Sequence, residues 1–428
     1  MAQSEQEVLT ERLDRYPPQR YPVQHATTQF HLGSALLHAS EWGPAQAALT
    51  VAQQVFADSG MRLEAAKASV MLGVALRAVG RLEEAEQTFT AAATDFAALG
   101  QGAEQAAASY NLGLVCQDRG DARGAYTAWT AARELFLAAG YPAQAGAAAR
   151  DHGGSLLTAG EVGAAVALLT EAVALAQRAD DVLGHGAAAN ALGLAHLADN
   201  DPTAAVAVLR SALGCFPRSV RPSENAMVKA NLALAHEQAA EPARARLAAG
   251  QALTLTGAAA PVRQQARAVL SRLPGPAHLA LLALLDHEPP ESWVPAIREE
   301  VLRLADASVA ERHRDLRGLL DGLLVRPGTC YDLAESLLSV VLELPPTSYA
   351  ALVAALVDGV GGRAEQDDER LRAVVGSAMA RFALPQWQRL AADFNAADFN
   401  AADFNAADLN AADLNAAATA ADRPARWR

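Results

Sequence analysis

Histidine and cysteine are the side chains of this sequence that could hold a metal, so their spacing decides whether they can act together. His31 and His38 lie seven residues apart, which places them on one face of a helix, a spacing open to a pair of metal ligands. No carboxylate or cysteine within helical reach on that face completes a ligand set. Cys116, Cys215 and Cys330 are far apart and form no C-x-x-C pair. We therefore expect no metal, no disulfide and a reducing, cytoplasmic location.

Motifs for catalysis and for nucleotide binding are missing as well. The sequence holds no phosphate loop, dinucleotide fingerprint, HExxH or G-x-S-x-G. Residues 152–160, HGGSLLTAG, contain glycines but lack the Lys-Ser/Thr of a phosphate loop. We therefore expect no cofactor and no catalytic residues. An enzyme with its site in residues 277–390 stays as an alternative, although no nucleophile, base and orienting group gather there.

Composition restricts the partners and the fold. Of 428 residues, 51% are hydrophobic but only 5% are aromatic, which favours closely packed helices over sheets. The net charge of −13 argues against nucleic acid, because affinity for phosphates needs clustered Lys and Arg. The N-terminus has no apolar signal segment, and no apolar stretch approaches the roughly 20 residues that span a bilayer. We expect no membrane partner.

An internal repeat of 40 residues sets the elements that would position any site. The pair Leu112–Gly113 recurs at 32–33, 72–73 and 192–193, and His152–Gly153 and Leu232–Ala233 fill the remaining places. Alanine follows each small residue after 12 and again after 19 residues. Before the first alanine lies a turn position, held by Ser40, Gly80, Gly120, Gly160, Asn200 and Ala240.

Each repeat is therefore predicted to be a helix, a turn and a second helix. Glycine costs a helix interior about 1 kcal/mol, so Gly113 needs a packing reason. We predict that it marks the contact between the two helices and that Ala125 and Ala132 are the small residues facing it. Small residues let helix axes approach to about 8 Å, and a larger side chain would cost about 1–3 kcal/mol.

The order of small residue, alanine, aromatic and alanine in LGLVCQDRGDARGAYTAWTAA resembles the tetratricopeptide repeat (TPR) family, in its long, 40-residue form, over residues 26–260. Cys116 stands where the family usually has tyrosine, and Trp129 holds the aromatic position. The resemblance implies an all-α, right-handed superhelical solenoid of six helix-turn-helix repeats. It also implies a non-catalytic scaffold or adaptor that binds another protein or peptide.

In that family the outward face of the first helix of each repeat lines a ligand groove. At about 100° per residue, this face holds positions 2, 6, 9 and 13 of repeats counted from Ala26, flanked by positions 5 and 12. The peptide-binding residues that the resemblance implies are Lys67, Arg77, Tyr110, Asn111, Leu114, Arg150, Asp151, Asn190, Leu194 and Asn231.

The chemistry of these residues suits a particular kind of peptide. The asparagines could hydrogen-bond a peptide backbone, whereas the few basic residues argue against the family's carboxylate clamp. Small and aliphatic side chains fill the rest, which suits an amphipathic helix or an extended apolar peptide. Whether the C-terminal half fills this groove is left open. A regulatory sensor, in which a peptide competes with that half, is the first alternative.

The remaining segments follow from proline, glycine and charge signals. Residues 1–25 are predicted to be an N-terminal helix and lead-in, and 261–273 a capping helix. Residues 277–390 are predicted to form a helical domain. Its expected helices are 277–287, 291–306, 309–325, 330–344, 347–360 and 366–382. Thr329 and Asp332 have the spacing of a capping box. A homo-oligomer formed through leucine-rich residues 333–357 is left open.

The tail, residues 391–428, begins with five near-identical pentapeptides, AADFN or AADLN, at 391–415. Their pattern resembles the pentapeptide-repeat family, whose units wind into a β-helix. Five units form little more than one coil, so a weakly ordered tail is the other interpretation.

Overall fold

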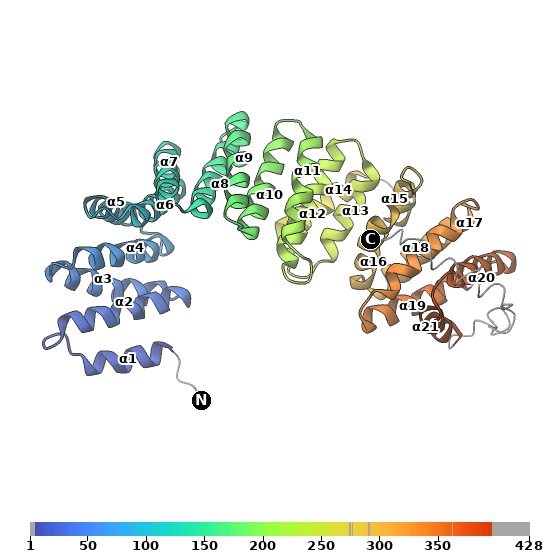
Figure 1. Cartoon of the computed structure of the whole chain (residues 1–428), viewed down its shortest axis with the longest axis horizontal. Coiled ribbons are helices and arrows are strands. Elements are labelled where there is room, and N and C mark those ends of the chain that lie inside the picture. The colour runs from blue at the N-terminus through green and yellow to red at the C-terminus, as the bar shows by residue number, and fades with distance from the viewer. Residues whose placement is uncertain (1–4, 274, 276, 290–291, 362, 396–428) are drawn as a thin grey trace. The chain divides into compact units, whose positions relative to one another are not determined.

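The computed structural model describes residues 5–273, 275, 277–289, 292–361 and 363–395, and these form helices and no strand (Figure 1). The chain divides into two compact units, Met1–Cys215 and Phe216–Arg428. The sixth predicted repeat therefore falls in the second unit. Most of the pentapeptide tail lies outside the described residues. No described helix is long and apolar enough to cross a membrane.

Unit 1 is a stack of helix pairs that follow one another along the chain (Figure 1). Its helices are α1 (Glu5–Arg15), α2 (Pro22–His38), α3 (Trp42–Asp58), α4 (Arg62–Ala78), α5 (Leu82–Ala98), α6 (Gly102–Asp118), α7 (Ala122–Ala138), α8 (Pro142–Thr158), α9 (Val162–Arg178), α10 (Val182–Ala198) and α11 (Pro202–Cys215). From α2 onward a helix begins every 20 residues. Two such helices, A and then B, make one repeat of 40. The predicted all-α fold of repeated, TPR-like helix pairs is confirmed, and helix A begins at Pro22, four residues before the predicted repeat start.

Left-handed backbone at every twentieth residue, from Ser40 to Asn200, closes the helices α2 to α10 of unit 1. Gly80, with φ +80°, follows α4, and its N–H donates to Arg77 O at 3.0 Å. The next N–H, of Arg81, reaches back to Leu76 O at 2.9 Å, which completes a Schellman motif. The predicted turn positions all have this conformation, from Ser40 to Ala240. Glycine favours it because it has no Cβ to clash.

The glycines of the column that contains Gly113 meet large side chains rather than small ones. A Cβ on Gly113 would lie 2.5 Å from the ring of Trp129 in α7, closer than packed atoms come. The same contact recurs in every pair of unit 1, as Gly33–Leu49, Gly73–Phe89, Gly153–Leu169 and Gly193–Leu209. The prediction that Gly113 marks the A–B contact is confirmed. The prediction of its partners needs correcting: Ala125 and Ala132 are buried, but the residue that fills the space above Gly113 is Trp129.

Two proline-bounded segments interrupt this rhythm, each before the first A helix of a unit. Residues 16–22, YPPQRYP, precede α2, and residues 216–222, FPRSVRP, precede the first helix of unit 2. In each, the carbonyl of the leading aromatic residue binds a side chain nine positions on. His25 Nδ1 lies 2.9 Å from Tyr16 O, and Asn225 Nδ2 donates to Phe216 O at 2.7 Å. Proline at the second position lacks the N–H that would continue a helix.

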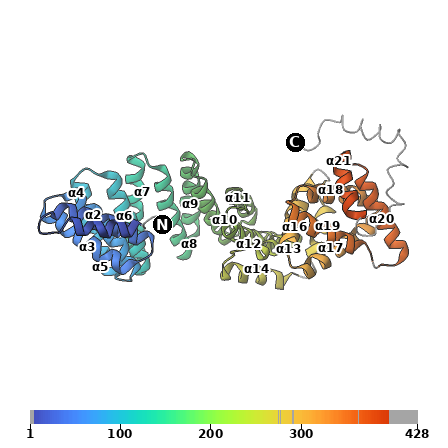
Figure 2. The same cartoon turned by 90° about the horizontal axis from the view of Figure 1, so that it is seen from below.

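Unit 2 begins with one more helix pair and continues with irregularly spaced helices (Figure 2), most of which share one large buried apolar cluster. Its helices are α12 (Pro222–Gln238), α13 (Pro242–Thr254), α14 (Ala260–Arg272), α15 (Ala277–Leu285), α16 (Trp293–Asp306), α17 (Val309–Leu324), α18 (Cys330–Leu342), α19 (Pro346–Val360), α20 (Glu365–Met379) and α21 (Leu384–Asn395). The helices predicted after residue 277 are present, with ends shifted by a few residues. Helix α21 was missed, and it takes in the first pentapeptide.

One predicted cap of unit 2 is wrong. Thr329 precedes α18 but its side chain makes no capping hydrogen bond. A complete capping box lies instead at α17, where Ser308 and Glu311 bond each other's backbone N–H groups. Asp332, the intended partner of Thr329, pairs with Arg381 at 2.8 Å. The spacing of Thr329 and Asp332 allowed a capping box but did not show that Asp332 would bind Arg381 instead.

Candidate functional site

The A helices of unit 1 form the inner side of its stack. Helix α2 contacts α4, α4 contacts α6, and α8 contacts α10, whereas neighbouring B helices, and α6 with α8 among the A helices, touch at most weakly. Repeats that approach more closely on one side curve toward it. We call the side chains at positions 6 and 9 of these helices the A-helix face. Its members are His31, Ser34, Met71, Val74, Asn111, Leu114, Asp151, Gly154, Ala191 and Leu194. All of them are half-buried except His31, which is exposed.

A polar cluster lies at the middle of the A-helix face, where Asp151 belongs to the face and Tyr110 and Arg150 flank it at position 5. Tyr110, on α6, donates its hydroxyl to Asp151 Oδ2 on α8 at 2.6 Å. Arg150, the neighbour of Asp151, donates Nε to the other carboxylate oxygen at 2.9 Å. One carboxylate thus holds a phenol and a guanidinium from two repeats. Because each side chain is fixed by another, the cluster presents a preorganised polar surface.

Charge in this region is balanced rather than basic. Arg77 on α4 donates Nε to Asp118 on α6 at 2.6 Å, one repeat from the Tyr110–Asp151 contact. Burial, and then the negative charge of Asp151, hold the pKa of Tyr110 well above its usual range. The phenol therefore stays protonated and serves as a donor throughout the physiological range. Two arginines matched by two aspartates do not make the strongly basic clamp that a peptide carboxylate needs.

Four other predicted residues also lie on or beside this face. Asn111 uses its amide to donate to Ala107 O at 2.9 Å, one turn back in α6. Leu114 and Leu194 are half-buried, and Lys67 on α4 is exposed. The A-helix face thus carries partly exposed leucines as well as the polar cluster, and its use as a binding groove stays a prediction.

Asn190 and Asn231 were predicted to lie exposed in the groove, but both side chains are buried. Asn190 is 7% exposed, so its side chain packs inside unit 1 rather than on the A-helix face. Asn231 belongs to α12 of unit 2, is 5% exposed, and accepts a hydrogen bond from Gln265 on α14 at 2.9 Å. Helix α14 covers this part of the sixth A helix. Helical periodicity placed both residues on the correct helix but could not anticipate the neighbours that bury them.

The residues considered as metal ligands are separate from one another. His38 Nδ1 lies 2.8 Å from Ser34 O in its own helix, while His31 packs its ring edge-on to Phe30. Across the described part of the chain, no three His, Cys, Asp or Glu side chains group as metal ligands would. The three cysteines are buried and unpaired, and burial raises the pKa of Cys116 and of Cys215, which keeps them as inert thiols.

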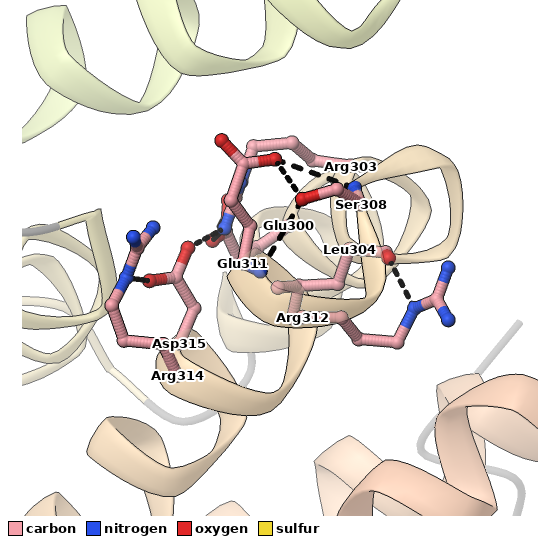
Figure 3. Close-up of polar contacts among 8 residues, drawn as sticks. All are labelled: Glu300, Arg303, Leu304, Ser308, Glu311, Arg312, Arg314 and Asp315. Atoms are coloured by element: carbon pink, nitrogen blue, oxygen red, sulfur yellow. Dashed lines mark hydrogen bonds and ion pairs between the residues drawn. The ribbon is translucent and has the colours of Figure 1, made fainter.

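A buried charge network in unit 2 was not predicted (Figure 3). Arg303 on α16 donates to both oxygens of Glu300 at 2.6–2.9 Å and to Asp315 Oδ2 on α17 at 2.6 Å. Glu300 is 0% exposed and Asp315 2%. Burial raises the pKa of the Glu300 carboxyl, and the bonds from Arg303 oppose that shift. The side chains bond one another, and the bond from Arg303 to Asp315 holds α16 against α17.

The comparisons with known proteins concern the fold. A scan of protein-family models and a search of curated proteins find no match to this sequence. Among solved structures, the chain is similar to BtubC (BKLC) from P. vanneervenii, at 15% identity and a TM-score of 0.43 over 50% of this chain and 91% of that one. It is similar to apo RapI at 11% identity and a TM-score of 0.42, over 86% and 98%. A kinesin light chain from Podosopora anserina with nearly identical TPR-like repeats matches at 16% identity and a TM-score of 0.37, over 48% and 95%.

Proposed function

We propose that this chain is a non-catalytic scaffold that binds another protein or peptide along the A-helix face of unit 1. The observation that carries the proposal is the arrangement around Asp151. Tyr110, Arg150 and Asp151 form a fixed polar cluster, and the A-helix face also carries the half-buried aliphatic side chains of Val74 and Leu114. Apolar contact with a few fixed polar groups is how binding sites combine affinity with orientation.

The best-suited ligand is an amphipathic helix or an extended apolar peptide. Aliphatic side chains on α4, α6 and α10 offer apolar contacts at intervals along the stack, and the central cluster can orient one polar group of the peptide. The balance of Arg77 and Arg150 against Asp118 and Asp151 disfavours ligands held only by charge.

Selection from a display library of random 15-residue peptides, with the full chain as bait, tests this proposal. We expect enriched peptides with regularly spaced apolar residues. Leu114→Glu should abolish their binding, because it places a charge where an apolar side chain of the peptide would pack. Thr127→Glu, at an exposed position of the B helix α7, is the matched control and should leave binding unchanged.

Two results would reject the site. Peptides that bind the wild type and the Leu114→Glu chain equally well use another surface. Failure to enrich any peptide, with circular dichroism showing an intact helical fold, would remove the peptide-binding function itself.

Regulation by the C-terminal helices is a second candidate, favoured by one contact in unit 2. Helix α14 contacts the A helix α12, and Gln265 donates a hydrogen bond to the carboxamide oxygen of Asn231. A ligand for the sixth A helix would have to displace α14. Peptide binding that strengthens in a Gln265→Ala chain would support this regulation, and unchanged binding would count against it.

A further inference from the structure

An open hollow of about 980 Å³ lies on unit 2, between α17, α19 and α21. Its floor is one face of α19, with apolar side chains at i, i+3, i+4 and i+7, namely Ala350, Val353, Ala354 and Val357. Ala350 and Ala354 are exposed. Arg317 and Arg389 also line it, and so do two acidic residues, Asp358 and Asp393. Both acids already have partners, since Asp358 binds His313 at 2.7 Å and Asp393 binds Tyr349 at 2.6 Å. The hollow therefore suits a ligand with an apolar side chain next to a carboxylate.

The first pentapeptide of the tail already docks at the edge of this hollow. Asp393 lines it and accepts the hydroxyl of Tyr349 at 2.6 Å, and Arg389 lies 3.8 Å above the same ring. Phe394 is 1% exposed and belongs to the core of unit 2. This Asp-Phe pair shows how a pentapeptide binds here: its carboxylate binds Tyr349 at the edge of the hollow, and its ring lies among apolar side chains.

Four more units follow directly in the sequence, outside the described residues. They carry the same pair of an acidic and an apolar residue, at Asp398–Phe399, Asp403–Phe404, Asp408–Leu409 and Asp413–Leu414. We propose that the hollow binds one of these later pentapeptides of the same chain. Its Phe or Leu lies on the apolar floor of α19, and its Asp lies beside Arg317 or Arg389.

The length of chain available permits this contact. From Asn395 to Phe399 the chain can extend about 14 Å, at up to 3.6 Å per residue. The floor from Ala350 to Val357 is about 10 Å long, at 1.5 Å per residue of helix. The second pentapeptide therefore reaches the hollow, as do the later pentapeptides. Four similar units tethered beside one hollow raise the local concentration of the ligand, which gives the repetition a physical use.

Disulfide trapping in the full chain tests the proposal. One cysteine replaces Ala354 on the floor and another replaces Asn400 in the tail, while the three natural cysteines stay buried. We expect a disulfide within one chain under mild oxidation. Changing Phe399, Phe404, Leu409 and Leu414 to alanine keeps the tether length and should slow its formation about tenfold or more, as loss of an apolar anchor requires.

A second pair of cysteines controls for the position of the hollow. Glu369→Cys, exposed on α20 and outside the hollow, should form the bond with the same tail cysteine more slowly. Equal rates at positions 354 and 369, no disulfide at all, or no change when the apolar anchors are removed would overturn the proposal. A disulfide that forms only between chains would overturn it too, and would assign the hollow to the tail of a second copy.

Discussion

Unit 1 and unit 2 bury their apolar residues in different ways. In unit 1 the core is a series of small clusters, such as the one of Cys116, Ala125 and Trp129, each shared between neighbouring helices. In unit 2 one continuous cluster takes in residues from α13 and from α15 to α21. A repeat whose helices contact only their neighbours can be copied without change, so unit 1 keeps a strict period. Helices that share one continuous core need not follow a fixed spacing, so the 20-residue period ends in unit 2.

The sixth helix pair shows the transition between the two ways of packing. Its A helix has Ala233 where the earlier pairs have glycine, and its B helix has Ala249 where they have Leu, Phe or Trp. Both alanines are fully buried. The glycine and its large partner are thus exchanged together, which is expected if the two positions share one fixed volume.

The largest expected effect is a loss of stability confined to unit 2 when its buried charge network is broken. Glu300→Gln leaves Arg303 buried with one carboxylate fewer, and should cost about 3–5 kcal/mol of the free energy of unfolding. Hydrogen exchange followed by mass spectrometry should show lost protection in α16 and α17 but not in α6 and α7.

The matched control for that variant is an exposed ion pair on the same helix. Arg298 on α16 binds Glu343 at 2.7 Å, with side chains 43% and 57% exposed. Glu343→Gln should cost under about 1 kcal/mol, since water screens the pair. If Glu300→Gln also lowers protection in unit 1, the two units unfold together and the contrast drawn above is wrong.

Two adjacent glycines of α8 test the packing of unit 1. Gly153→Ala would place a Cβ 2.7 Å from Leu169 Cγ and should cost about 1–3 kcal/mol. Gly154→Ala meets nothing within 4 Å and should instead stabilise the chain by about 0.5–1 kcal/mol, as alanine favours the helix. Chemical denaturation of both variants checks the opposite signs. Equal effects would mean that the contact with Leu169 does not require glycine in this column.

The turn of the sixth pair gives a smaller effect that can be compared with unit 1. Ala240 has φ +58°, where a Cβ is strained, so Ala240→Gly should stabilise unit 2 by about 0.5–1 kcal/mol. Gly160→Ala, at the equivalent turn of unit 1 with φ +83°, should destabilise by a similar amount. Thermal unfolding of the two variants measures both. A loss of stability in Ala240→Gly would show that this turn is held by contacts other than its backbone conformation.

The smallest effect concerns the pH response of unit 1. His152 packs on the ring of Tyr126, with centroids 4.7 Å apart, and burial, then Arg133, lower its pKa below 6.5. The unfolded chain therefore binds this proton more readily, and stability should fall as the pH drops below about 6.5. His152→Phe should flatten that part of the profile. Unfolding measured from pH 7.5 to 5.5 checks the difference, and parallel profiles would exclude His152 as the cause.

The regular part of the fold was predictable because its signals are local. Each turn residue, from Ser40 to Asn200, ends its helix through its own backbone conformation. The column of leucine and glycine then sets which faces meet. The candidate site was predictable only in part, because local signals place a residue on a helix face but do not show which neighbours cover it. Tyr110, Arg150 and Asp151 follow the helical period, whereas Asn190 and Asn231 follow it too but are covered by neighbours.

The sequence by itself determined the helical period, the turns and the pairing of helix A with helix B in every repeat. These follow from glycine, alanine and aromatic residues at fixed spacing, which act between chain neighbours. Tertiary structure alone decided that Trp129 fills the space above Gly113, that Arg303 binds Glu300 and Asp315, and that α21 takes in the first pentapeptide. Such contacts depend on which distant side chains share a volume or a buried charge, and local sequence does not carry that information.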